Sequence, residues 1–361
     1  MKAYQITKNL NGLTDLPACL LKNVESPIPG PDEVLVNVNC AGMNFFDILQ
    51  VQGKYQDQPP FPFIPGSEFS GMISKDSPIP TGCNFIPGKT RVFGSTQGAY
   101  AEKVKARWDR LIEMPDGLSF EQSAGLYITY PTSYVALVNR GQLKKGEWCL
   151  IHAAAGGVGI AAVQIAKALG ARVIATASSQ QKLDFVRKEG GLSPIDDHTI
   201  VYSDTVVTSA PDAKKKPGKL LEWQAEVMKI TKGKGVDVVF DPVGLLNKSL
   251  KVSGWNSRLV VVGFAGGDIE KVPANLLLLK NSAVTGVFWG AHLKNEPETV
   301  TQVWLSILEL VKRGQIRPVL HPKIYQGLES LQEGLNDLAN RKVLAKAILQ
   351  IKVEPSGKSK L

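Results

Sequence analysis

A glycine-rich turn between a buried strand and a helix constrains the fold of this chain more than any other feature. The run LIHAAAGGVGI covers residues 150–160. Compared with the pattern G-x-G-x-x-G, it supplies Gly156 and Gly159 and carries Ala154 in place of the first glycine. Gly156 lets the backbone approach a pyrophosphate, and Gly159 lets the helix pack closely on the strand. The N–H groups at the start of the helix, from Gly157 and Val158 onward, then face phosphate oxygens. A tight strand-to-helix turn without a ligand is the alternative.

The elements that follow this turn alternate between strand and helix. Strand-like runs at residues 148–152, 172–176, 236–240, 259–262 and 284–288 are separated by helical runs such as 160–169 and 182–188. Such alternation predicts an α/β fold with a doubly wound parallel sheet. Residues 190–219 are long and irregular, and we expect a surface insertion there rather than part of the sheet.

The first third of the chain has a different texture. Short alternating runs such as residues 33–38 are separated by many prolines and glycines, which indicates a small β-rich domain. One helix is expected to begin near Asn44–Asp47, because Asn and Asp are good N-terminal capping residues. A length of 361 residues is enough for two domains.

The end of the second strand bears on the choice of nucleotide. A fold selective for NAD usually places an acidic residue there to bind the ribose 2′-OH. This chain has Ser178 and Lys182 instead, with no carboxylate before Asp184. Small hydroxyls followed by a lysine suit a 2′-phosphate, so the sequence favours NADPH over NADH. The alternative is that Ser178 only caps the next helix.

Charge and composition exclude several classes of function. The formal net charge is +9, but the densest basic run, residues 214–216, lies between prolines and has no interleaved aromatic residues. The sequence therefore does not favour nucleic-acid binding. Four scattered cysteines do not form a disulfide framework, which favours a reducing compartment. No apolar run has the length of a spanning helix, and no N-terminal signal is expected.

Several further motifs make the chain resemble a zinc-free medium-chain dehydrogenase/reductase of the quinone oxidoreductase (zeta-crystallin-like) type. These motifs are residues 42–47 (GMNFFD), 153–159 (AAAGGVG), 241–244 (DPVG), 274–281 (ANLLLLKN) and 286–290 (GVFWG). The resemblance implies a GroES-like β-rich catalytic domain split around a Rossmann domain. The expected boundaries are residues 1–127 and 292–361 for the catalytic domain and its tail, and 128–291 for the NADPH-binding domain. A homodimer through the Rossmann edge strands is also implied.

The same comparison predicts that no metal is bound. Zinc-dependent alcohol dehydrogenases carry a cysteine where Asn44 stands and Gly-His-Glu where this chain has Gly-Ser-Glu, with Ser67 in place of the histidine. Thiolate and imidazole are both missing from these positions, so the usual tetrahedral site is not expected. His152, alone on a buried strand, is predicted to be a hydrogen-bonded core residue.

The resemblance also implies roles for individual residues. Tyr55 resembles a proton donor of related enoyl-thioester reductases, and Asn44 is the second catalytic candidate; the alternatives are a loop aromatic packed on Pro59-Pro60 and a helix cap. Lys182 and Tyr202 would frame the 2′-phosphate. The remaining nucleotide-binding candidates lie beside the nicotinamide or close the site: Asn44, Thr132, Gly263, Phe264, Phe288, Trp289 and Lys346.

The last three residues, Ser359-Lys360-Leu361, match the peroxisomal address that a soluble import receptor reads. The polar residues 355–358 before them would leave such a signal accessible. We therefore expect peroxisomal targeting, with a cytoplasmic location as the alternative.

The predicted function is metal-independent transfer of hydride from NADPH to a quinone or to an α,β-unsaturated carbonyl. Without a Lewis acid, alcohol oxidation lacks its alkoxide stabiliser, whereas a conjugated acceptor spreads the negative charge itself. One alternative is a peroxisomal 2-enoyl thioester (enoyl-CoA) reductase. An alternative of another class is an NADPH-binding protein with a structural or RNA-binding role.

Overall fold

The computed structural model describes residues 1–208 and 219–352, and it divides into two compact units. The first unit combines the N-terminal segment Met1–Ile128 with the segment that starts at Pro318, and the second unit is Thr129–Arg317. The expected second boundary, at residue 292, differs from the observed one at 318. Helix α10 (Pro297–Lys312) contacts α3 (Thr129–Tyr134), so residues 292–317 belong with the second unit.

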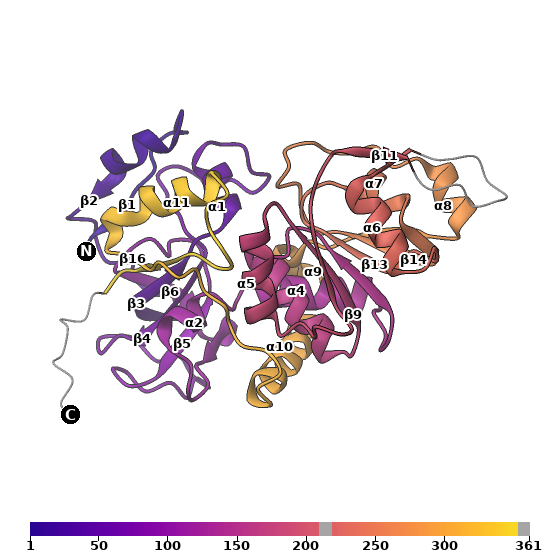
Figure 1. Cartoon of the computed structure of the whole chain (residues 1–361). Coiled ribbons are helices and arrows are strands. Elements are labelled where there is room, and N and C mark those ends of the chain that lie inside the picture. Colours follow the sequence, from indigo (N-terminus) through magenta and orange to yellow (C-terminus); the bar gives the residue numbers. More distant parts are fainter. Residues whose placement is uncertain (209–218, 353–361) are drawn as a thin grey trace, which may run out of the picture. The chain divides into compact units, whose positions relative to one another are not determined.

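The first unit is built on a mainly antiparallel seven-stranded sheet (Figure 1). Its strand order is β16-β17-β3-β4-β5-β7, and β6 pairs with β3. The strands are β3 (Glu33–Gly42), β4 (Glu68–Ile73), β5 (Arg91–Ser95), β6 (Lys103–Arg107), β7 (Leu111–Glu113), β16 (Tyr325–Gln326) and β17 (Ile348–Gln350). Strand β3 lies at the centre because its buried apolar side chains, such as Val34 and Val36, face the core of this unit.

Short elements complete the first unit. The strands β1 (Ala3–Tyr4) and β2 (Leu20–Leu21) form a separate pair. The helices are η1 (Leu13–Cys19), α1 (Phe45–Val51), η2 (Trp108–Arg110), α2 (Phe120–Ala124), η5 (Leu328–Ser330) and α11 (Leu331–Ala339). Helix α1 begins where expected, because Asn44 is its N-terminal cap. The C-terminal segment returns to this unit through β17, which pairs with β3.

The second unit contains a six-stranded sheet in which every neighbouring pair is parallel. Its strand order is β10-β9-β8-β13-β14-β15, which reverses direction at β8, the first strand in sequence, as in a Rossmann fold. The strands are β8 (Trp148–Ile151), β9 (Arg172–Ala177), β10 (His198–Val201), β13 (Val236–Asp241), β14 (Ser253–Val261) and β15 (Ala283–Gly286). The predicted α/β class is thereby confirmed.

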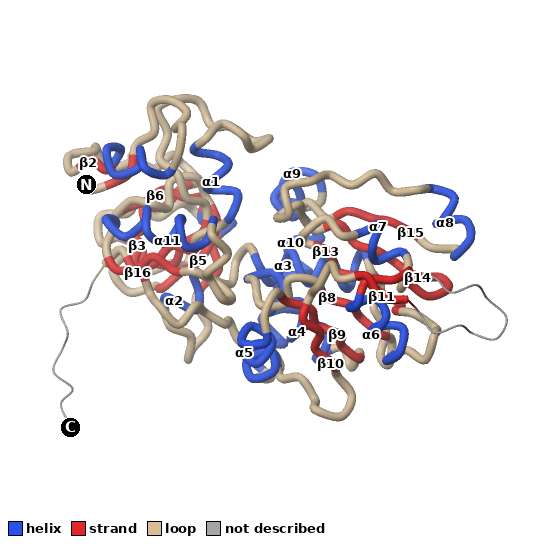
Figure 2. The backbone as a smooth tube through the Cα atoms, turned by 45° about the horizontal axis from the view of Figure 1, so that its top comes forward, coloured by secondary structure: helices blue, strands red, loops and turns tan. Residues whose placement is uncertain are grey.

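Helices lie on both faces of the parallel sheet (Figure 2). Leu150 and Val239 belong to a core cluster with Trp223 of α6 and Leu250 of α7, whereas α4 and α5 contact each other and β9. Because side chains alternate along a strand, successive buried residues of β8 and β13 serve both layers. The helices of this unit are α3, the π-helix η3 (Val135–Arg140), α4 (Gly157–Ala168), α5 (Gln180–Gly190), α6 (Glu222–Ile230), α7 (Leu246–Leu250), α8 (Ala274–Lys280), η4 (Trp289–Ala291), α9 (His292–Asn295) and α10.

The expected insertion at residues 190–219 is wrong in part. Residues 198–201 form β10, which pairs with β9 and is the third strand of the Rossmann order. This strand is short and has only Ile200 buried, so its hydrophobic pattern is weak. The rest of the stretch leads into a separate antiparallel pair, β11 (Val206–Thr208) with β12 (Lys219–Leu221). The basic run at residues 214–216 lies outside the described residues.

Candidate functional site

The glycine-rich turn connects β8 to α4 as the sequence predicts. Gly156 is the N-terminal cap of α4, with extended backbone dihedrals. A Cβ atom on Gly159 would lie 2.2 Å from the carbonyl oxygen of Ala153, so no larger residue fits there without a shift of the backbone. A Cβ on Gly156 would meet only that same oxygen, at 3.3 Å. Gly159 is therefore required by the packing of the turn, whereas Gly156 leaves its outer side available for a ligand.

The backbone N–H groups of Gly157 and Val158 lie in the first turn of α4. The first N–H groups of a helix have no partner within the helix and carry its positive dipole end. Helix α4 has twelve residues and begins directly at the edge where the parallel strands end. This arrangement suits a pyrophosphate.

The end of β9 places Ser178 and Lys182 in one short loop and helix start. Ser179, rather than Ser178, is the N-terminal cap of α5, and its Oγ accepts from the Lys182 backbone N–H at 3.4 Å. The alternative that Ser178 caps this helix is thus wrong. Ser178 is exposed, and Lys182 is half-buried.

Tyr202 lies next to this loop, because its backbone N–H donates to the carbonyl oxygen of Ala177, the last residue of β9, at 2.8 Å. Its phenol oxygen is 2.9 Å from the Lys248 ammonium and 2.8 Å from an Asp204 carboxylate oxygen. Burial raises the pKa of Tyr202. The structure therefore brings three of the predicted 2′-phosphate residues to one end of the sheet, and it adds Lys248, for which the sequence predicts no role.

The remaining predicted residues of the second unit follow the ends of neighbouring strands. Gly263 and Phe264 come shortly after β14, and Phe288 and Trp289 come shortly after β15. In a parallel sheet these positions share the edge that carries the glycine-rich turn. Phe264 and Phe288 are exposed and Trp289 is buried. Thr132 lies in α3, which contacts α4, and the hydroxyl of the neighbouring Ser133 donates to the Val158 carbonyl oxygen at 2.7 Å.

A buried cluster of polar side chains occupies the first unit. The Asn44 side chain does not cap α1 but donates to Glu68 Oε1 at 2.9 Å, and its own Oδ1 accepts from the Lys346 ammonium at 2.5 Å. Lys346 also forms an ion pair with Glu68, whose other oxygen accepts from the Ile128 backbone N–H at 3.1 Å. The side chains of Lys346 and Glu68 are 5% and 0% exposed. The structure therefore joins two predicted residues, Asn44 and Lys346, through a carboxylate that the sequence does not single out.

A second buried group lies beside this cluster. Asp47 accepts from the Tyr100 hydroxyl at 2.5 Å, from the Asn44 backbone N–H at 2.8 Å and from the Ser67 hydroxyl at 3.3 Å. Burial raises the pKa of Asp47 to about 6, although the hydrogen bonds from Tyr100 and from the Asn44 backbone and the positive charge of Lys346 oppose the rise. Ser67, predicted only as the residue in place of a zinc-binding histidine, is thus part of a hydrogen-bonded network. Contacts between residues so distant in sequence leave no local signal.

Tyr55 lies in the loop after α1 and stacks on Phe46, with ring centroids 5.2 Å apart. The alternative packing of Tyr55 on Pro59-Pro60 stays a prediction. Burial raises the pKa of Tyr55, and the negative charges of Asp57 and Asp47 raise it further. The phenol accordingly keeps its proton at neutral pH.

His152 is a hydrogen-bonded core residue, as predicted. Its two ring nitrogens lie 2.9 Å from the Thr176 and Ser249 hydroxyls, and the side chain is fully buried. Within residues 1–208 and 219–352, no three His, Cys, Asp or Glu side chains gather in a way that could hold a metal ion. The absence of a bound metal stays a prediction.

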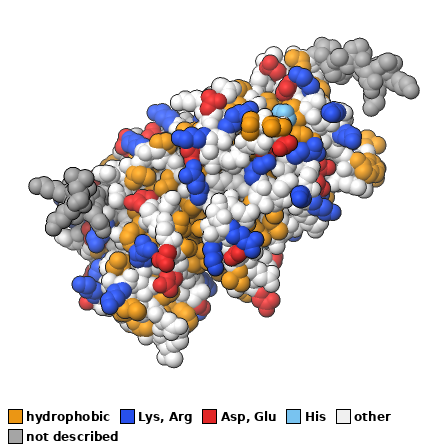
Figure 3. Space-filling model, turned by 60° about the horizontal axis from the view of Figure 1, so that its bottom comes forward, with side chains coloured by type: hydrophobic (Ala, Val, Ile, Leu, Met, Phe, Trp, Pro, Cys, Tyr) orange, Lys and Arg blue, Asp and Glu red, His pale blue; other side chains and the backbone are white. Residues whose placement is uncertain are grey.

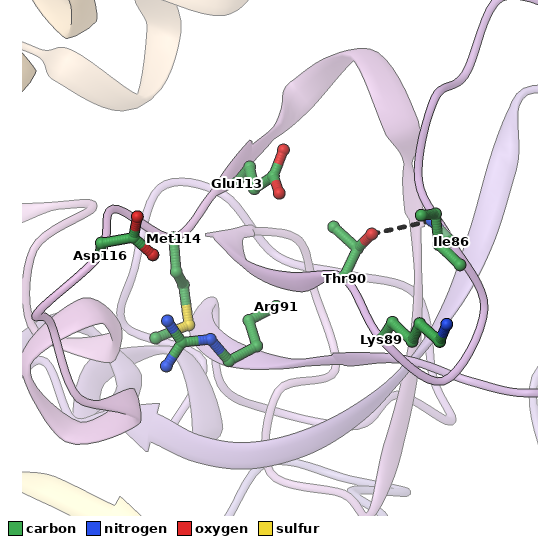
Figure 4. A pocket seen from close by; sticks show the side chains of 7 residues that line it. All are labelled: Ile86, Lys89, Thr90, Arg91, Glu113, Met114 and Asp116. Carbon is green, nitrogen blue, oxygen red and sulfur yellow. Dashed lines mark hydrogen bonds between the residues drawn. The ribbon is translucent and has the colours of Figure 1, made fainter.

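A pocket of about 220 Å³ lies elsewhere in the first unit (Figure 4). It is lined by charged side chains that include Lys89, Arg91, Glu113 and Asp116. Arg91 begins β5, whereas Ser95 at its other end pairs with Glu68. The pocket is therefore separate from the polar cluster around Glu68, and none of the predicted site residues lines it.

Two family models match the chain. "Alcohol dehydrogenase GroES-like domain" matches residues 30–116, and "Zinc-binding dehydrogenase" matches residues 157–306. The first match lies in the unit with the antiparallel sheet, and the second lies in the unit with the Rossmann sheet. Together they define the class of two-domain nucleotide-dependent dehydrogenases.

Similar proteins narrow this class. A quinone oxidoreductase-like protein 2 homolog from Nematostella vectensis is 34% identical over 329 residues, covering 90% of this chain and 83% of the relative. A probable oxidoreductase from Mycobacterium abscessus has a solved structure with 32% identity and a TM-score of 0.80, covering 97% and 98% of the two chains. The Escherichia coli quinone oxidoreductase complexed with NADPH gives 26% identity and a TM-score of 0.78, covering 97% and 100%. The chain belongs to the medium-chain dehydrogenase/reductase family, among its quinone oxidoreductase-like members.

Proposed function

We propose that this protein transfers hydride from NADPH to a quinone or to the double bond of an α,β-unsaturated carbonyl compound. The observation that carries this proposal is the edge of the Rossmann sheet, where a glycine-rich turn, Ser178, Lys182 and Tyr202 lie at the ends of adjacent strands. The E. coli relative that was solved with NADPH supports the choice of nucleotide.

The residues of the second unit fit this nucleotide. Gly156, Gly157 and Val158 would hold the pyrophosphate at the start of α4, and the exposed Ser178 with Lys182 would receive the 2′-phosphate. The absence of a Cβ on Gly156 leaves the room that such a close approach needs. When bound, the nucleotide supplies the hydride.

The first unit supplies a buried cation, the Lys346 ammonium, for the proposed reaction. Lys346 places two of its three N–H bonds on Glu68 and Asn44, and this fixes the position of a cation inside a buried site. A fixed cation stabilises the negative charge that develops on a carbonyl oxygen as hydride arrives. Asn44 has both polar atoms engaged by Glu68 and Lys346, so we assign it the role of orienting Lys346.

A 2-enoyl thioester reductase is the second candidate, and Tyr55 favours it. Reduction of an enoyl thioester requires a proton at the carbon next to the carbonyl, and a phenol that keeps its proton at neutral pH is a suitable donor. The stacking on Phe46 holds the Tyr55 ring in one orientation.

Rapid mixing of the protein and NADPH with a quinone, an alkyl enone or a 2-enoyl-CoA tests both candidates. We expect oxidation of NADPH, seen as loss of nicotinamide absorbance, with the quinone or the enone. Faster turnover of the enoyl-CoA that is lost in Tyr55→Phe would favour the second candidate. Tight NADPH binding without oxidation by any acceptor would instead favour a structural or RNA-binding role. One observation argues against an RNA-binding role: on the face shown in Figure 3, Lys and Arg side chains are spread among Asp and Glu side chains.

We also propose that the protein is imported into peroxisomes through Ser359-Lys360-Leu361, which lie outside the described residues. A fluorescent protein fused to the N-terminus should collect in peroxisomes, and deletion of these three residues should leave it in the cytoplasm. The same location for both forms would contradict the proposal. No helix in the described part of the chain is long and apolar enough to cross a membrane.

A homodimer is the third proposal, and two features of the second unit support it. Strand β15 is an edge strand of the described parallel sheet, and edge strands expose unpaired backbone groups. Helix α8, which precedes it, exposes Leu278 and Leu279 at 81% and 68%. Pairing of two copies along β15 would complete the backbone hydrogen bonds and cover these leucines.

A further inference from the structure

Three side chains from two segments of the chain meet beyond the end of β10: Tyr202, Asp204 and Lys248. The Lys248 ammonium is 2.9 Å from the Tyr202 hydroxyl, 2.8 Å from an Asp204 carboxylate oxygen and 5.6 Å from the centre of the Tyr202 ring. Tyr202 and Asp204 follow β10, whereas Lys248 lies in α7, which follows β13. The cluster therefore connects the segment after β10 with helix α7 at the carboxyl edge of the sheet.

This cluster adjoins the residues proposed to bind the 2′-phosphate. The backbone hydrogen bond from Tyr202 to Ala177 fixes Tyr202 beside the loop that contains Ser178 and Ser179. The Lys248 ammonium, within hydrogen-bond distance of the Tyr202 hydroxyl, therefore reaches the carboxyl edge of the sheet from α7, whereas Lys182 reaches it from α5. A phosphate dianion has acceptors for several donors, so two lysines and a phenol can bind it together.

The charges indicate what happens when an anion arrives. Asp204 raises the pKa of Lys248, and Lys248 lowers the pKa of Asp204, so both groups are ionised at neutral pH. Their side chains are 38% and 65% exposed, and an ion pair this accessible to water is weak. A phosphate can therefore replace the carboxylate as the partner of Lys248 at little cost.

We propose that Lys248 is a second cationic ligand of the NADPH 2′-phosphate and that Asp204 competes with the phosphate for it. The inference rests on the proposed nucleotide function and deepens it. Lys248 contributes to the preference for NADPH over NADH, because NADH has no group that replaces the carboxylate. In the absence of the nucleotide, the Asp204 carboxylate is the ion-pair partner of the Lys248 ammonium. When NADPH binds, this carboxylate repels the 2′-phosphate.

Equilibrium titration of the full-length protein with NADPH and NADH, followed by nicotinamide fluorescence, tests this inference. In Lys248→Met the Kd for NADPH should rise about tenfold, the equivalent of one charge-assisted hydrogen bond, while the Kd for NADH stays unchanged. In Asp204→Asn the Kd for NADPH should instead fall about threefold, as expected for release from a weak competing ion pair. A folding defect does not tighten binding, so the second variant keeps the test decisive.

Lys251→Met is the matched control. Lys251 is exposed and lies three residues after Lys248, at the end of the same helix. Its replacement by methionine removes the same charge. If the two lysine variants weaken NADPH equally, or if Lys248→Met weakens NADPH and NADH alike, the inference is overturned while the proposed function stands. If the wild-type protein binds neither nucleotide, the proposed function fails, and the inference fails with it.

Discussion

At the scale of single residues, the buried carboxylate of Glu68 connects three partners in the first unit. It accepts from the side chains of Asn44 and Lys346 and from the backbone of Ile128. Removal of one partner from a buried ion pair leaves a charge without compensation, which costs far more than the pair contributes. The cluster is therefore sensitive to changes on either side.

The variant Glu68→Gln should lower the free energy of unfolding by about 3 kcal/mol, because the Lys346 ammonium then lacks a counter-charge. Lys346→Met should lower the free energy of unfolding by a similar amount, because the Glu68 carboxylate then lacks a counter-charge. The double variant Glu68→Gln/Lys346→Met should lose clearly less than the sum of the two, as measured by urea unfolding. Simple additivity would show that the pair does not act as a unit.

The buried His152 in the second unit predicts that the free energy of unfolding depends on pH. Burial lowers the pKa of His152 to about 4 from an ordinary value of 6.5. Between these values the unfolded chain binds more protons than the folded one, so the folded state loses stability as the pH falls. The loss approaches about 3 kcal/mol near pH 4.

The difference in unfolding free energy between wild type and His152→Gln, measured from pH 7.5 to pH 4.5, isolates this effect. We expect the stability that wild type has over the variant to shrink steadily as the pH falls through 6.5. Asp47, whose raised pKa acts in the opposite direction, is present in both proteins and drops out. A difference independent of pH would contradict the assignment of His152 as a neutral core residue.

At the scale of elements, the turn between β8 and α4 separates packing from binding. Gly159→Ala should lower the unfolding free energy by about 2–3 kcal/mol, because its Cβ would overlap the Ala153 carbonyl oxygen. Gly156→Ala should be nearly as stable as wild type and yet bind NADPH much more weakly. Thermal unfolding and nucleotide titration of both variants check this, and equal stability of the two would contradict the role given to Gly159.

The strands of the second unit show how far the sequence predicts this fold. The strands β8, β9 and β13 are apolar and centrally placed, so their hydrophobic runs identify them. The sequence does not predict strand β10, because an edge strand with one buried residue leaves little hydrophobic pattern. Short β-branched runs at a sheet edge are in general recognised only through the partner strand.

The site is less predictable than the fold, for a physical reason. The turn at residues 156–159 is a local pattern, and local geometry dictates its glycines. The family resemblance predicts Asn44 and Lys346 separately, but their connection through Glu68 joins the ends of three different strands and depends on tertiary packing. Lys248 lacks any local signal, because its partners follow another strand of the sheet.

At the scale of the whole molecule, the proposed dimer predicts a clear response to one substitution. Leu279→Asp should convert the protein from dimer to monomer in light scattering, because a charge would be buried at the β15 and α8 surface. Leu305→Asp is the control, since Leu305 is equally exposed on α10, away from that surface. A wild-type monomer at micromolar concentration, or a dimer that survives Leu279→Asp, would contradict the proposal.

Few of the surplus positive charges of the chain have a proposed function. Of the net +9, only Lys182, Lys248 and Lys346 are assigned to the nucleotide or to the proposed reaction. Asn44 and Ser67, which the resemblance predicts to stand in the place of zinc ligands, take part in buried hydrogen-bond networks. The molecule is thus interpreted as a reductase that relies on a nucleotide and on fixed polar side chains.

The most direct test of the central claim is the ratio of kcat/KM for NADPH to that for NADH with one quinone as acceptor. We expect turnover with both nucleotides and a ratio of about one hundred or more, since the proposed ligands of the 2′-phosphate include two lysines and a phenol. A ratio near one, or no oxidation of NADPH by the quinone, would contradict it.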